Sequence, residues 1–152
     1  MDIHQFARNG EVENLLKLVK NDSSLINLKD QRGFTPLIMA TYNEQFEAAK
    51  LILELGAEIN EQDDSGNTAL MGVCFKGSIS MAKLLIENNA DINKQNFNGA
   101  TALIFAATFG HKELITLLLQ NGAMKDIADN KGNTALIQAK MQGVDEIIVL
   151  LS

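Results

Sequence analysis

The chain of 152 residues is long enough for one well-buried domain, and its 46% hydrophobic content excludes a disordered chain. The net charge of −6 comes without a cluster of Lys and Arg, which argues against a nucleic-acid partner. The single cysteine, Cys74, cannot form an internal disulfide, which favours a reducing, cytoplasmic setting. The first residues do not resemble a secretory signal, and no run of about 18 apolar residues predicts a membrane span.

Residues 2–29 predict a pair of helices, with Gly10 at the break between them. The apolar residues at helical spacing on the second of these helices are Leu15, Leu16, Leu18 and Val19. The segment is in register with the repeats that follow it, although it lacks their Gly-x-Thr turn. We therefore interpret it as an N-terminal unit of the same kind.

From residue 33 onward the chain repeats itself. A Gly-x-Thr-x-Leu stretch occurs four times at a constant step of 33 residues: at 33–37, 66–70, 99–103 and 132–136. Self-similarity at a fixed period of this size is typical of repeat architectures, in which each unit buries its apolar face only against its neighbours. Because the period is held over almost the whole chain, it leaves no room for a second domain.

Each copy carries the signals for two helices. The Thr is a good N-cap for a short apolar helix, and Pro36 occupies a first helical position, where its missing N–H costs nothing. The short helix is predicted over 37–41, 70–74, 103–107 and 136–140. Glu44, Gly77, Gly110 and Gly143 then mark a break before a longer apolar helix. The longer helix is predicted to end at Gly56-Ala57, Asn89-Ala90 or Gly122-Ala123.

The register divides the chain into five units, which are 1–32 as an N-terminal cap, 33–65, 66–98, 99–131, and 132–152 as a C-terminal cap. In the last unit Lys140 stands where the other copies have Thr41, Cys74 or Ala107. A charge at this position suits an end unit that no further neighbour covers. We therefore predict an all-α repeat solenoid of one domain.

The recurring residues resemble ankyrin repeats. The resemblance rests on the Gly-x-Thr turns, on Gly110-His111-Lys112-Glu113, and on the stretches 56–60 and 89–93, which read Gly-Ala-Glu-Ile-Asn and Asn-Ala-Asp-Ile-Asn. It covers essentially the whole chain. It implies antiparallel helix pairs with β-hairpin-like turns, stacked into a curved solenoid with a concave face. It also implies a protein-binding module rather than an enzyme.

One family position differs in this sequence. The histidine of the family's Thr-Pro-Leu-His motif is replaced by Ile38, Met71, Ile104 and Ile137. Because that histidine helps to tie neighbouring turns in the family, the resemblance implies less rigid turns on the same fold.

No group of residues predicts catalysis, a metal site or a cofactor. His4 and His111 lie 107 residues apart, and His111 fills a family position, which indicates a structural role. Cys74 replaces a small packing residue, so burial explains it better than reactivity. The glycines are not clustered as in a phosphate-binding loop, and one Cys with two distant His does not supply a zinc site. Asn27, Asn60 and Asn93 recur in register, which a role in the turns explains.

Aromatic residues are concentrated where the repeat framework leaves positions free. In this fold those positions are the turn tips and the outward side of the first helix, which line the concave face. Six of the eight aromatic residues lie there, and exposed aromatic anchors are typical of interfaces. Alternatively, several of them fold onto neighbouring turns and close the core. The predicted partner-binding residues are Arg32, Phe34, Met39, Tyr42, Phe75, Lys76, Phe97, Phe105 and Phe109.

We therefore expect a non-catalytic adaptor or inhibitor that binds a protein or peptide on its concave face. Two alternatives stay open. A small acidic protein also fits an immunity-type role against a basic toxin or enzyme, and residues 44–64 hold seven acids against the single base Lys50. Apolar residues of the last helix, such as Val149, fit self-association, so a monomer is expected and a homodimer is the alternative.

Overall fold

The computed structural model describes residues 2–152, which fold into ten α-helices arranged as five pairs and form no strand. The pairs are α1 (Ile3–Asn9) with α2 (Val12–Asn21), α3 (Pro36–Tyr42) with α4 (Phe46–Glu54), α5 (Ala69–Lys76) with α6 (Ile79–Glu87), α7 (Ala102–Thr108) with α8 (Lys112–Gln120), and α9 (Ala135–Gln142) with α10 (Asp145–Leu151). A 3₁₀ helix, Ser23–Asn27, follows α2. The all-α repeat solenoid predicted from the sequence is confirmed.

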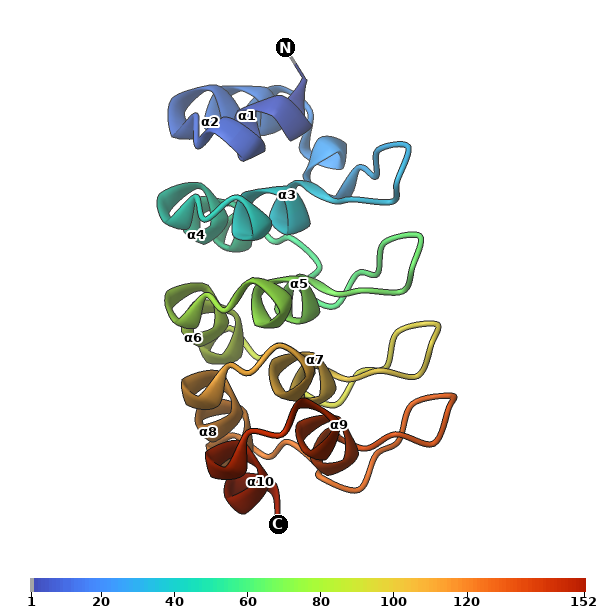
Figure 1. Ribbon diagram of the computed structural model, residues 1–152. Helices are drawn as coiled ribbons and strands as arrows, with labels where there is room; N and C mark the ends of the chain where they lie inside the picture. Colours follow the sequence, from blue (N-terminus) through green and yellow to red (C-terminus); the bar gives the residue numbers. More distant parts are fainter. Residues whose placement is uncertain (1) are drawn as a thin grey trace.

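The helices stack in two rows (Figure 1). The odd-numbered helices form one row and the even-numbered helices the other, and each helix packs mainly against its pair partner and the equivalent helices of the neighbouring pairs. The long turns between pairs all project from one side of the stack, beside the row of odd-numbered helices. The two termini lie at opposite ends. None of the helices in residues 2–152 is long and apolar enough to cross a membrane.

Threonine side chains start four of the odd-numbered helices, as predicted. The hydroxyl oxygen of Thr68 accepts a hydrogen bond from the backbone N–H of Met71 at 3.3 Å, and the other three threonines bond the N–H three residues on in the same way. Each bond satisfies one of the backbone donors that a helix start leaves free. In the first unit Asp2 takes this role and forms a capping box with Gln5.

The last residues of the helices differ from the prediction. Helices α5 and α6 end a different number of residues before the left-handed residue that turns the chain. Helix α5 continues to Lys76 rather than to 74, since the first residue that turns the chain out of the helix is Gly77, with φ of 87°. Helix α6, in contrast, ends at Glu87, two residues before the predicted Asn89-Ala90, because Asn89 adopts φ of 67° after one intervening cap residue. The break and closing residues named from the sequence are therefore right, and the helix lengths between them are not.

Small side chains form the centre of the first row. Ala40, Val73 and Ala106 are fully buried at equivalent positions of α3, α5 and α7, which lets these helices lie close together. Thr41, Cys74 and Ala107, one residue further on, are also buried, whereas Lys140 is exposed on α9. The same face of the helix is therefore core in the inner units and surface in the last one.

Hydrogen bonds join each projecting turn to the next. The backbone N–H groups of Asp64, Phe97 and Asn130 donate to the carbonyl oxygens of Arg32, Ser65 and Asn98. Below the turns, the side-chain oxygens of Asn27, Asn60 and Asn93 accept from the backbone N–H groups of Glu58, Asp91 and Met124, each in the following unit. These bonds tie neighbouring turns together, although the chain has no histidine at the position, such as Ile38, where the resemblance implies one.

Candidate functional site

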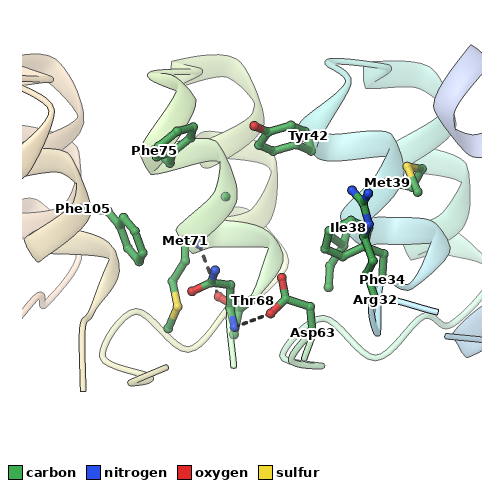
Figure 2. A pocket seen from close by; sticks show the side chains of 12 residues that line it. Arg32, Phe34, Ile38, Met39, Tyr42, Asp63, Thr68, Met71, Phe75 and Phe105 are labelled. Carbon is green, nitrogen blue, oxygen red and sulfur yellow. Dashed lines mark hydrogen bonds between the residues drawn. The ribbon is translucent and has the colours of Figure 1, made fainter. Parts of the chain in front are cut away.

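A pocket of about 400 Å³ opens between α3, α5 and α7 on the side of the turns (Figure 2). Its wall is mostly apolar. The residues that line it are Arg32, Phe34, Ile38, Met39, Tyr42, Asp63, Asn67, Thr68, Met71, Gly72, Phe75 and Phe105. Six of the nine residues predicted to bind a partner are among them. All the lining residues except Arg32, which ends the segment 1–32, lie between residues 33 and 131.

The pocket coincides with a missing side chain. Gly72 on α5 occupies the repeat position that holds Met39 on α3 and Phe105 on α7. The neighbouring helices thus carry long apolar side chains where α5 carries none. Met39 and Phe105, at this repeat position, are among the residues predicted to bind a partner, but Gly72 is not. The sequence does mark this position, because the other three copies carry Met39, Phe105 and Gln138 there and only this copy has a glycine.

Met39 differs from the expectation of a free surface position, because only 5% of it is exposed. The side-chain amide of Asn43, one helical turn on, donates to the carbonyl oxygen of Met39 at 2.8 Å and lies 3.6 Å from its sulfur. Met39 therefore belongs to the wall of the pocket rather than to its rim.

The aromatic residues at the ends of the helices pair with their neighbours and remain partly exposed. The rings of Phe75 and Phe109 meet edge to face, with centroids 4.7 Å apart and planes at 75°. Lys76 places its ammonium 4.6 Å from the centroid of the Tyr42 ring and donates to the Tyr42 carbonyl oxygen at 2.7 Å. Tyr42, Phe75 and Phe109 nevertheless stay exposed. The sideways packing considered from the sequence thus holds for these residues without removing them from the surface.

Phe97 lies apart from the pocket, at the tip of a turn, and is 65% exposed. Its ring covers Gly66 of the preceding turn so closely that a Cβ there would lie 2.7 Å from the ring. Lys76, Phe97 and Phe109 do not line the pocket, so the predicted set divides into six pocket residues and three residues outside it.

The polar side chains of the pocket lie at the turns. One carboxylate oxygen of Asp63 accepts the backbone N–H groups of Ser65 and Asn67 at 2.8 and 2.9 Å. Arg32 is the one cation in the pocket lining. Within residues 2–152 the ion pairs are Lys29 with Glu61 and Lys112 with Glu146, so the Arg32 guanidinium lies within 4.0 Å of no carboxylate.

The two histidines and the cysteine serve the fold. His4 donates through Nε2 toward the carbonyl oxygens of Leu28 and Phe34, each at 2.8 Å, and His111 donates to that of Phe75 at 3.0 Å. The His4 bond to Phe34 and the His111 bond to Phe75 each join neighbouring units, whereas the His4 bond to Leu28 lies within the first unit. Burial raises the pKa of the Cys74 thiol from 9.0 to about 12, which keeps it protonated.

Comparison with known proteins identifies the repeat. The chain is 40% identical to the human DNA-binding protein RFXANK over 58 residues, which are 38% of this chain and 22% of that protein. It is 40% identical over 57 residues to the palmitoyltransferase akr1 of Aspergillus oryzae, covering 38% and 8%, and 42% identical over 55 residues to acyl-CoA-binding domain-containing protein 1 of Arabidopsis thaliana, covering 36% and 16%. The matches thus span less than a quarter of each relative.

A family model described as ankyrin repeats (3 copies) matches residues 3–96 and 70–152. Together the two matches reach from the first helix to the last residue. The chain therefore belongs to the ankyrin repeat family, whose members are generally protein–protein interaction modules and typically non-catalytic.

Proposed function

We propose that this chain is a non-catalytic adaptor or inhibitor that binds a segment of a protein partner across α3, α5 and α7. The observation that carries the proposal is the pocket beside Gly72, together with the exposed rings of Tyr42, Phe75 and Phe109 at its edge and beyond it. Partly exposed aromatic residues next to an apolar pocket provide the buried anchors that dominate interface energetics.

The non-catalytic part of the proposal is supported by the state of the nucleophilic and basic groups. The Nε2 atoms of His4 and His111 are engaged by backbone carbonyls, and the Cys74 thiol is buried and protonated. A general base must be free to reach the proton that it removes. A reduced, buried thiol also fits the cytoplasmic setting that we propose for the protein.

Affinity capture from a lysate of the source cell tests the proposed face. Wild type is compared with a Phe105→Ser, Phe109→Ser variant and with Phe46→Ser, which removes an exposed ring from α4 in the other row of helices. All three must show the same helical circular dichroism. We expect wild type and Phe46→Ser to retain one common protein, which the double variant loses. A partner that the double variant retains equally well contradicts binding at this face.

Self-association is a second candidate, because the last unit exposes apolar side chains. Val149 is 75% exposed on α10, and Ile137 and Met141 are exposed on α9. Sedimentation equilibrium decides between the candidates: a dimer that Val149→Glu dissociates supports self-association, and a monomer at tens of micromolar contradicts it.

The immunity-type alternative places a basic partner on the acidic residues of 44–64. Of these acids only Asp63 lines the pocket, and Glu61 is paired with Lys29. The acids therefore do not gather at the apolar site, and a partner held by charge would bind elsewhere on the chain. Binding that Phe105→Ser leaves intact and that high salt abolishes would favour this alternative.

A further inference from the structure

Gly72 has no role in shaping the backbone. Ten of the eleven glycines in the chain have positive φ, and Gly72 is the exception, inside helix α5. A Cβ added to it would meet only the Tyr42 ring, at 3.5 Å, which is an ordinary contact. Alanine would therefore fit, and glycine inside a helix is the less stable choice. A residue that breaks a local rule without a backbone reason is expected at functional sites.

The space left by Gly72 has the character of an aromatic binding site. Figure 2 shows Phe105 extending from α7 on one side of α5, and Ile38 and Met39 on α3 on the other. Tyr42 and Phe75 lie at the C-terminal ends of α3 and α5, away from the turns. Ring edges and methionine sulfur are favourable neighbours for an inserted aromatic ring. The pocket volume of about 400 Å³ admits such a side chain with part of its backbone.

The charges of the pocket are asymmetric. Arg32 is without a carboxylate partner, whereas Asp63 already accepts two backbone N–H groups. Lys76, a cation outside the lining, is engaged by the ring and carbonyl of Tyr42. A guanidinium prefers a carboxylate in bidentate geometry, so Arg32 complements an acid on the partner.

We propose that Gly72 determines specificity by admitting one aromatic side chain of the partner, while Arg32 pairs with a carboxylate next to that side chain in the partner segment. The inference rests on the proposed function and states the chemistry of the segment that this face selects.

Selection from a phage-displayed library of random linear peptides tests the inference. The baits are wild type, Gly72→Met and Arg32→Glu. Gly72→Met gives α5 the side chain that α3 carries at the equivalent position, Met39. Two controls repeat these changes at the same repeat positions outside the pocket: Gln138→Met on α9, and Lys131→Glu in the last turn. Circular dichroism and thermal melting establish that each bait is folded.

We expect wild type and both controls to enrich peptides in which an aromatic residue lies near Asp or Glu. Arg32→Glu should enrich an aromatic residue near Lys or Arg instead. A wild-type-selected peptide, measured by fluorescence polarisation, should bind Gly72→Met at least about tenfold more weakly and Gln138→Met equally well, as expected for a buried anchor that loses its pocket.

Two results overturn this inference and leave the proposed function standing: a wild-type motif without an aromatic residue, or equal affinity of the selected peptide for wild type and folded Gly72→Met. An unchanged motif for Arg32→Glu removes the carboxylate half of the inference. If wild type enriches no common motif at all, both the inference and segment binding at this face are contradicted.

Discussion

At the scale of single residues, the position of Gly72 inside a helix predicts that replacing it by alanine stabilises the protein. Because glycine in a helix interior is less stable than alanine by roughly 0.5–1 kcal/mol, Gly72→Ala should raise the free energy of unfolding by about that amount. Urea denaturation measures it. Gly99→Ala is the contrasting control, since φ is 77° there and a Cβ would lie 2.6 Å from the Asn130 side chain. Gly99→Ala should destabilise the protein, and a destabilising Gly72→Ala would contradict the packing described for α5.

The raised pKa of the buried Cys74 thiol predicts slow alkylation of the folded chain and a loss of stability at alkaline pH. In the folded chain it should react with iodoacetamide at pH 8 far more slowly than in urea, because the thiolate is the nucleophile and burial raises the pKa to about 12. Below pH 9.0 the thiol is protonated in both states. Between 9.0 and 12 the unfolded chain loses the proton first, so stability falls as the pH rises. Cys74→Ala should lose this part of the alkaline destabilisation.

Six of the residues predicted to bind a partner line the pocket because they were selected by excluding the positions that the repeat framework needs. Phe34, Tyr42, Phe75 and Phe105 stood at positions that the repeat does not need for its core. Met39 stood at such a position too, yet it is buried, because the exposure of a side chain depends on neighbours from other units. A pairing such as Phe75 with Phe109 likewise joins residues 34 positions apart, and no local pattern contains it.

At the scale of helices, the threonine caps predict unequal effects in inner and end units. Thr101→Ala should lower the free energy of unfolding by about 1 kcal/mol, within a range of roughly 0.5–2, because it leaves the N–H of Ile104 without a partner in a buried site. Thr134→Ala should have a smaller effect, since Ile137 is exposed and water can bond its N–H. Thermal denaturation of the two variants makes the comparison. Equal losses would contradict the role assigned to burial.

Helix starts were more predictable than helix ends. A threonine cap fixes a start within one residue, because its hydroxyl bonds one particular N–H, as Thr35 does for Ile38. An end is set by the first residue that leaves the helical region, and the number of cap residues before it varies. Tyr42 is followed by Asn43 before left-handed Glu44, whereas Lys76 is followed directly by Gly77. That difference is one of local geometry and does not appear in the repeat period.

At the scale of the whole molecule, the position of Lys140 predicts that its charge opposes association of the chain in solution. It lies on α9 at the position that is buried between units at Cys74 and Ala107, with the apolar residues Ile137 and Met141 beside it. A charge there opposes burial of that face. Lys140→Ala should therefore associate at concentrations at which wild type is a monomer, which analytical ultracentrifugation detects. Lys140→Gln controls for a general change in net charge, and identical sedimentation of all three proteins would contradict this role.

The stacking of helices only against adjacent pairs has a consequence for local opening. Within residues 2–152, the pairs α1–α2 and α9–α10 each pack against one other pair. In a protein of these residues their amide hydrogens should therefore exchange with solvent sooner than those of α5, which is covered on both sides. The pocket draws on α3, α5 and α7 alone. Fraying that begins at either tip of the array therefore leaves the binding site assembled, and breathing of the ends need not shorten the lifetime of a complex.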